Sequence, residues 1–131
     1  MKFAILITGA PYSSQAPQTA LSFCEAARKR GDDVIRVFLY GDGVHLANAL
    51  STPPSDEANW YRRWSDWLER ENVEAVVCVA SALRRGLIDE REAGRYEKAH
   101  FNVTAPWQIA GLGELVSAGN DADRLIHFGP A

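Results

Sequence analysis

The segment EAVVCVASALRRG, residues 74–86, contains a short apolar run that leads directly into a helical pattern. The run from Ala75 to Ala80 is typical of a strand that is buried on both faces of a sheet. A strand that is followed at once by a helix is the repeating unit of parallel α/β sheets, so this stretch predicts the fold class. It also places Cys78 close to the junction of the two elements.

The rest of the chain repeats this alternation of strands and helices. Apolar runs predict the remaining strands at 2–8, 33–40, 106–111 and 123–129. Helical patterns lie at 18–30, after residue 55, at 81–99 with a break near Gly86, and from residue 111. The sequence therefore predicts an α/β fold of the flavodoxin-like type. We expect a three-layer sandwich with a mostly parallel, five-stranded sheet and helices on both faces.

One predicted helix carries an unusual number of tryptophans. Ser55 is a suitable N-cap for this helix, because its hydroxyl can accept a hydrogen bond from the first turn. Trp60, Trp64 and Trp67 follow at a spacing that aligns them on one helix face. Such a stripe fits core packing. It also fits a subunit interface, where aromatic residues are enriched.

The connection between the second strand and this helix, residues 41–57, is long for a compact domain. Gly41 and Gly43 predict a turn at its start. Long connections are often binding loops or interface segments. Its apolar residues, which we expect to be partly exposed in a monomer, are Val44, Leu46, Ala47 and Leu50.

Length, charge and cysteine content narrow the class of protein. The 131 residues suit a single domain, 1–131, with one core. A net charge of −3 argues against a surface that grips nucleic acid directly. Two cysteines, Cys24 and Cys78, are too few for a disulfide framework and are expected to be thiols in a reducing compartment. The first apolar run is too short for a signal peptide, and no stretch approaches a membrane span, so we expect a cytoplasmic protein.

Cys78 is the leading candidate for chemistry. In open α/β sheets, reacting groups gather at the carboxyl ends of the strands, where this residue is expected. The unpaired N–H groups at the start of the following helix favour an anion such as a thiolate. Arg84 and Arg85 come later in that helix, and either could fold back toward the sulfur. The alternative stays open, because a free cysteine flanked by valines is often part of a core.

The other candidate features are weaker. Cys24 shares a helix face with apolar residues and is interpreted as core. The loop at 8–19 lies where flavodoxin-like proteins hold a phosphate, but it lacks the Gly-Lys-Ser/Thr ending of a P-loop. His45, His100 and His127 have no partners at metal-ligand spacing, so no metal site is predicted. Of these histidines, His45 is the one best placed to approach the candidate thiol.

Four blocks of the sequence are together similar to a known family. The segment CVASALRRGLIDEREAGR, 78–95, resembles the active-cysteine segment of the DsrE/TusD sulfurtransferases. The segments FLYGDGVHLAN (38–48), TPPSDE (52–57) and GLGELVSAGNDADRLIHFG (111–129) fit the family in the same order. The resemblance covers nearly the whole chain and implies the DsrE-like fold. It departs from the family pattern at Ser81, where alanine is expected.

The resemblance implies a sulfurtransferase that needs no metal or organic cofactor and carries sulfur on Cys78 as a persulfide. Ser81, Arg84 and Arg85 are the supporting candidates. Family members take sulfur from a TusA-like donor and pass it to a TusE-like or DsrC-like acceptor. They assemble with two related subunits, of the TusB/TusC or DsrH/DsrF kind, as a dimer of heterotrimers.

The resemblance leaves the end point of the relay open. In the TusD branch the sulfur reaches 2-thiouridine at the wobble position of tRNA, and in the DsrE branch the relay serves dissimilatory sulfur oxidation. The overall pattern favours TusD. A flavodoxin-like module that binds FMN or a nucleotide through residues 9–19 is the remaining alternative.

Overall fold

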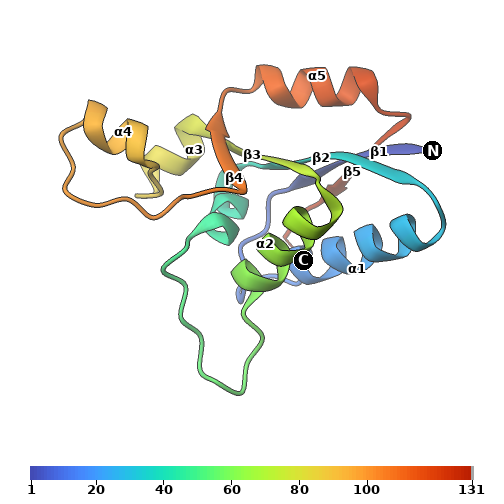
Figure 1. The fold of residues 1–131 in the computed structure, drawn as a ribbon, viewed down its shortest axis with the longest axis horizontal. Coiled ribbons are helices and arrows are strands. Elements are labelled where there is room, and N and C mark those ends of the chain that lie inside the picture. Colours follow the sequence, from blue (N-terminus) through green and yellow to red (C-terminus); the bar gives the residue numbers. More distant parts are fainter. Residues whose placement is uncertain (131) are drawn as a thin grey trace.

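The computed structural model describes residues 1–130, within which a five-stranded, entirely parallel sheet has the order β4-β3-β2-β1-β5 (Figure 1). The strands are β1 (Lys2–Ile7), β2 (Asp33–Leu39), β3 (Glu74–Cys78), β4 (Trp107–Ala110) and β5 (Arg124–Phe128). The helices are α1 (Ala16–Lys29), α2 (Trp60–Glu71), α3 (Val79–Arg84), α4 (Glu90–Arg95), α5 (Gly113–Asp121) and the 3-10 helix η1 (Gly41–Ala47). The predicted α/β sandwich is confirmed. Among these described residues, no helix has both the length and the apolar character that crossing a bilayer requires.

The two faces of the sheet are covered unequally. Helices α1 and α2 lie on one side, and α5 lies on the other (Figure 1). The larger buried cluster, which includes Val37 and Val77, lies on the side of α1 and α2. Because side chains alternate along a strand, Phe38, Val76 and Cys78 form a smaller cluster on the α5 side. Cys78 therefore belongs to the thinner layer of the molecule.

Helix α2 begins later than the sequence pattern predicts. Ser55 does not cap it, so that prediction is wrong. The chain turns at 54–57, where the Glu57 N–H donates to the Pro54 carbonyl at 3.0 Å. Asn59 has an extended backbone, and its side chain accepts the N–H of Arg62, which makes it the N-cap. The capping function thus lies four residues further along the chain than the serine.

The tryptophan stripe of α2 is mostly core. Trp64 and Trp67 are buried, and their rings meet edge to face with centroids 5.7 Å apart. The Trp64 indole donates to the Pro17 carbonyl at 2.8 Å, which joins α2 to the start of α1. Trp60 is half-buried against the same core. Two of the three rings are therefore used inside this chain and are not free for a partner subunit.

The start of the 41–57 connection is folded inward, contrary to expectation. Val44, Leu46 and Ala47 are fully buried, because η1 turns them toward the core. Leu50 alone of the four apolar residues is exposed, at 70%. Gly43 lies so close to the Ile7 carbonyl that any side chain at this position would collide with it. The absence of a side chain at Gly43 is what lets η1 pack against the end of β1.

The region after β3 forms two short helices, as the predicted break near Gly86 requires. Gly86 has a φ of +78°, which ends α3. Helix α4 starts after Asp89, whose carboxylate accepts the Glu92 N–H at 2.8 Å. The third strand is shorter than the apolar run suggests, because Val79 already belongs to α3. The change from strand to helix therefore occurs directly after Cys78.

Candidate active site at Cys78

Cys78 occupies the junction that the sequence predicts for it. It is the last residue of β3, where it pairs with Ala110 of β4, and it is also the N-cap of α3. The carboxyl ends of neighbouring parallel strands meet at this edge of the sheet, where α/β proteins commonly place reacting groups. The position is therefore suited to chemistry on the sulfur.

The Cys78 side chain is nevertheless almost completely covered. The residue is 2% exposed and packs with Phe38 and Val76. Leu6 of β1 and Leu115 of α5 lie against the same cluster. Within residues 1–130 its side chain makes no capping hydrogen bond to α3. Reaction of the sulfur with another protein therefore requires a local movement of the groups around it.

Neither arginine of the candidate set is shown in contact with the sulfur. Arg85 is engaged with η1: its Nε donates to the Asp42 carboxylate at 2.9 Å. Its Nη1 also donates to the Ser81 carbonyl at 3.2 Å. Arg84 is exposed and lines a shallow surface hollow with Leu83 and other residues. Arg85 thus positions η1 relative to α3.

Ser81 has a positioning role of the same kind. Its Oγ accepts the Gly41 N–H at 3.0 Å. Together, Gly41 and Asp42 of η1, Ser81 of α3 and Arg85 at the C-cap of α3 form what we call the η1–α3 clamp. The clamp holds the chain that leaves β2 against the helix that follows Cys78.

Comparison with known proteins agrees with this architecture. The profile of the DsrE/DsrF-like family matches residues 1–128. The chain belongs to this family. It is 45% identical over 129 residues to the DsrE protein of Allochromatium vinosum, which covers 98% of this chain and 99% of that protein.

Two TusD proteins are similarly close relatives within the family. The sulfurtransferase TusD homolog of Pseudomonas aeruginosa is 45% identical over 129 residues, covering 98% of each protein. The sulfurtransferase TusD of Salmonella typhi is 41% identical over 128 residues, covering 98% of this chain and 100% of the relative. The crystal structure of the ychN protein from E. coli has the same fold, with a TM-score of 0.72 at 22% identity over 98% of this chain and 99% of that chain.

Cys24, the other cysteine of this DsrE-family chain, is part of the core, as the sequence analysis predicts. Cys24 lies in α1 and is fully buried. Burial raises the pKa of the Cys24 thiol to about 12, and the charge of Glu25 acts in the same direction. The thiolate, which is the nucleophilic form, is therefore strongly disfavoured at this position.

None of the three histidines takes part in the hydrogen bonds of the η1–α3 clamp. His127 Nε2 and Thr8 Oγ1 share a hydrogen bond of 2.7 Å at the ends of β5 and β1. His45, the histidine expected to be best placed for Cys78, is half-buried in η1. Within residues 1–130, no group of three or more His, Cys, Asp or Glu side chains is arranged to hold a metal ion.

The serine-rich loop after β1 uses its polar groups internally. Ser14 Oγ accepts the Ala16 N–H at 3.0 Å. Gly9 lies so close to Ser14 that a side chain at position 9 would collide with it. Pro17 in the first turn of α1 has no N–H to offer. These contacts reduce the number of donors that this loop can direct at a phosphate group.

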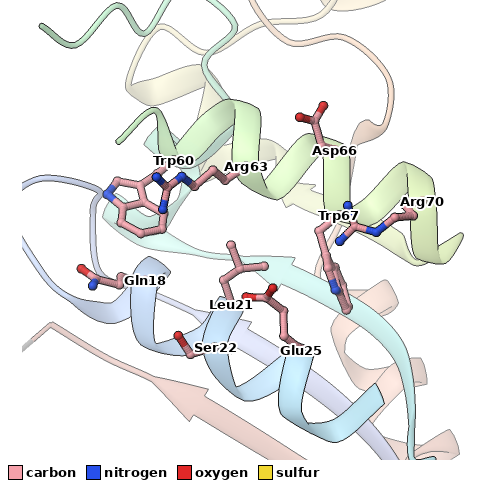
Figure 2. Close-up of a pocket in the computed structure, with 9 residues that line it drawn as sticks. All are labelled: Gln18, Leu21, Ser22, Glu25, Trp60, Arg63, Asp66, Trp67 and Arg70. Atoms are coloured by element: carbon pink, nitrogen blue, oxygen red, sulfur yellow. The ribbon is translucent and has the colours of Figure 1, made fainter. Parts of the chain in front are cut away.

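A separate groove of about 380 Å³ lies between α1 and α2 (Figure 2). Leu21 lies between Trp60 and Trp67 in this groove, and the Arg63 guanidinium stacks 5.1 Å from the centre of the Trp60 ring. Because α1 and α2 cover the face of the sheet opposite α5, the groove is separated from the Cys78 cluster by the sheet (Figure 1). It is therefore not part of the candidate active site.

Two residues at this edge of the sheet were not identified from the sequence as part of the candidate site. Asp42 is the partner of Arg85, and Tyr40 directly follows the strand beside β3. The sequence placed them in a predicted strand and in the long connection after it, without linking either residue to Cys78. The available signal was the parallel sheet itself, since residues that directly follow adjacent strands lie at the same edge.

Proposed function

We propose that this chain is the sulfur-carrying subunit of a persulfide relay and that Cys78 holds the transferred sulfur. The observation that supports this most is the position of Cys78 at the β3–α3 junction, in a chain whose curated TusD relatives are named sulfurtransferases. Cys24 is not proposed for this role, because it lies in the middle of α1 and its pKa is raised to about 12. The chain acts as one domain and is a transferase of the sulfurtransferase class.

Loading consists of one exchange at sulfur. The Cys78 thiolate attacks the outer sulfur of a persulfide on a donor protein. The sulfur–sulfur bond of the donor breaks, and the donor thiolate leaves with the electron pair of that bond. Cys78 then carries the outer sulfur as a persulfide. The proton of the persulfide exchanges with solvent.

Unloading is the same exchange with the roles reversed. A thiolate of the acceptor protein attacks the outer sulfur on Cys78, and the Cys78 thiolate leaves. The sulfur keeps its oxidation state throughout, so the transfer requires no external oxidant or reductant. One cysteine is sufficient for both steps, first as nucleophile and then as leaving group.

The supporting residues act through position. Ser81 and Arg85 hold the start of η1 against α3, and thereby the chain beside Cys78. Arg84 is exposed at the end of α3 and is free to meet a negative charge on a docked partner. In this proposal none of the three takes part in the bond changes at sulfur.

The partners follow from the family. We expect two related subunits of the TusB/TusC or DsrH/DsrF kind in a cytoplasmic dimer of heterotrimers, a TusA-like donor and a TusE-like or DsrC-like acceptor. The end point is 2-thiolation of the tRNA wobble uridine. The net charge of −3 supports a carrier that leaves binding of the RNA to other components.

Sulfur oxidation is the second candidate for the relay. The DsrE protein of Allochromatium vinosum and the TusD homolog of Pseudomonas aeruginosa are both 45% identical to this chain over 129 residues. Complementation of a strain that lacks TusD, read out as the 2-thiouridine content of its tRNA, separates the two. Restored 2-thiouridine supports the tRNA pathway, and no restoration favours oxidation.

Intact-mass measurement after incubation with glutathione persulfide tests the role of Cys78. The wild-type chain is expected to gain the mass of one sulfur atom, and Cys24→Ala is expected to gain it as well. Cys78→Ser should show no gain. Sulfur loading that persists in Cys78→Ser would refute the assignment.

A further inference from the structure

The burial of Cys78 raises the question of what covers its sulfur on the side from which a partner must approach. We propose that the ring of Tyr40 is this cover and that it determines which thiols reach the Cys78 persulfide. The inference rests on the proposed function and adds a specificity-determining residue to it. Four observations support it, and each concerns the carboxyl end of β2.

The first observation is register. Leu39 of β2 pairs with Val77 of β3, so the next residues along the two strands, Tyr40 and Cys78, lie opposite each other. The Tyr40 N–H donates to the Ile7 carbonyl of β1 at 3.1 Å, so its backbone is still hydrogen-bonded to the sheet although β2 ends at Leu39. Neighbouring strands are about 4.8 Å apart, so Tyr40 and Cys78 are separated by one strand spacing.

The second observation is the direction of the side chain. Tyr40 has an extended backbone, with φ −135° and ψ 151°, and side chains alternate along an extended chain. Phe38 packs in the same cluster as Cys78, whereas Leu39 packs in the cluster on the opposite face. The Tyr40 side chain therefore emerges on the face that carries Cys78.

The third observation is the contrast in exposure between these neighbours. Tyr40 is 43% exposed, while Cys78 is 2% exposed. Phe38, Val76 and Leu115 pack around Cys78 within the protein. Tyr40 directly follows β2 and is the next residue after Phe38 on the same face of the sheet, at its carboxyl edge. An exposed side chain changes rotamer within picoseconds to nanoseconds, so this ring can move aside more easily than the packed groups.

The fourth observation is the η1–α3 clamp. Gly41 and Asp42, the two residues after Tyr40, are hydrogen-bonded to Ser81 of α3 and to Arg85 at its C-cap. The backbone of Tyr40 is thus held on one side by β1 and on the other by the helix that follows Cys78. A fixed backbone with a half-exposed ring is suited to a cover that opens by side-chain rotation alone.

Such a cover has a chemical purpose in a relay. Small thiols attack persulfides as readily as protein thiols do, and the sulfur they remove is lost to the acceptor. A docked protein can displace the ring through contacts that a small thiol does not make. Tyr40 would therefore favour the acceptor protein over small-molecule thiols.

The test compares Tyr40→Ala with Tyr40→Phe, which keeps the ring. Tyr96→Ala is the matched control, because Tyr96 is another exposed tyrosine and lies after α4. Iodoacetamide probes the Cys78 thiol, and dithiothreitol probes the persulfide formed with glutathione persulfide. Both reactions should be roughly fivefold faster in Tyr40→Ala, and within about twofold of wild type in the other two variants.

Equal rates in wild type and Tyr40→Ala would overturn the inference, and so would an equal acceleration in Tyr96→Ala. Tyr40→Val removes the ring but keeps strand propensity, so it replaces the alanine variant if that one melts far below wild type. Faster alkylation of Cys78 in Tyr40→Ala without persulfide loading in any variant would refute the proposed function and leave the cover standing. Normal persulfide loading, with rates of alkylation and of reaction with dithiothreitol that do not change in Tyr40→Ala, would support the proposed function and refute the cover.

Discussion

At the scale of single residues, the two cysteines differ in their place in the fold and not in their degree of burial. Cys24 lies in the middle of α1, surrounded by core, while Cys78 ends a strand at the open edge of the sheet. In the cover that we propose, moving one side chain uncovers the second site alone. Position within an element, more than exposure in the resting structure, separates a structural thiol from a candidate carrier.

Because the Cys24 thiol is buried, we predict that it makes the folded protein lose stability at alkaline pH. Burial raises its pKa from 9.0 to about 12, so between these values the unfolded chain releases a proton that the folded chain keeps. The stabilising contribution is complete below the unfolded value and is lost as the pH rises toward the folded value. Urea unfolding at neutral pH and at about pH 10.5 should show a larger loss for wild type than for Cys24→Ala. Equal losses in the two proteins would contradict the prediction.

We predict that any side chain at position 43 destabilises the fold through a steric clash. An added Cβ would meet the Ile7 carbonyl and the Thr8 backbone, neither of which can rotate away. Gly43→Ala should therefore lower the free energy of unfolding by about 2–4 kcal/mol. Gly119 in α5 is the matched control because nothing lies near its missing side chain, and Gly119→Ala should stabilise the protein by up to about 1 kcal/mol. Similar urea midpoints for the two variants would contradict this account of η1.

At the scale of secondary-structure elements, α5 is held to the sheet mainly by one arginine. Among its residues, which the structure describes in full, α5 buries only Ala118, whereas α1 buries six. Arg36 of β2 pairs with Glu74 at 2.7 Å and with Glu114 at 3.0 Å, and it also donates to the Glu114 carbonyl at 2.9 Å. Apart from the packing of Leu115 and Ala118, the helix that covers the Cys78 cluster is thus held mainly by contacts of a single side chain.

Arg36→Met should loosen α5 selectively. Glu74 and Glu114 are both partly exposed, so water can solvate them once their partner is removed. Amide hydrogen exchange is expected to become several-fold faster in α5 and to stay unchanged in α1. Arg30→Met, at an exposed arginine outside this network, serves as the control. Uniform acceleration over both helices would mean that Arg36 stabilises the whole fold instead.

Ser81→Ala tests the η1–α3 clamp. The Gly41 N–H loses its acceptor, which should cost about 1 kcal/mol of folding free energy. Persulfide loading of Cys78 should persist, because the serine positions η1 and takes no part in the exchange at sulfur. Loss of loading at unchanged stability would instead assign Ser81 a role in the chemistry.

At the scale of the whole molecule, three exposed aliphatic residues lie on the side of α5. Val116 lies in this helix and is 61% exposed, and the exposed Leu112 is the N-cap of the helix. Leu125 of β5 is exposed on the same side, since its neighbour Ile126 packs into the opposite cluster. The tryptophans of α2 and the residues of η1 are used inside the chain. The α5 side is therefore where we expect the related subunits to bind.

Co-expression with the two related subunits tests this expectation. We predict a complex of all three chains and a marked loss of that complex for Val116→Asp. Leu50→Asp is the matched control, because Leu50 is even more exposed but lies in the 41–57 connection. Mass measurement of the eluted species provides the readout. Three chains that elute separately at micromolar concentration, with sulfur transfer intact, would rule out the hetero-oligomer.

The sequence by itself determined the order and type of the elements. Strands and helices differ in the period of their apolar residues, and both periods are local properties that can be read along the chain. The same local pattern located the β3–α3 junction, and with it Cys78. Capping was harder to predict, because Ser55 and Asn59 are both capable caps and the turn at 54–57 selects between them.

Only the tertiary structure decided which residues surround Cys78. The contacts of Ser81 and Arg85 with η1 join segments that lie about forty residues apart in the chain. The burial of Val44 and Leu46 likewise depends on η1 packing against the larger core cluster. Such contacts follow from strand order and register. Those are set by the packing of the whole sheet, and no local pattern in the sequence encodes them.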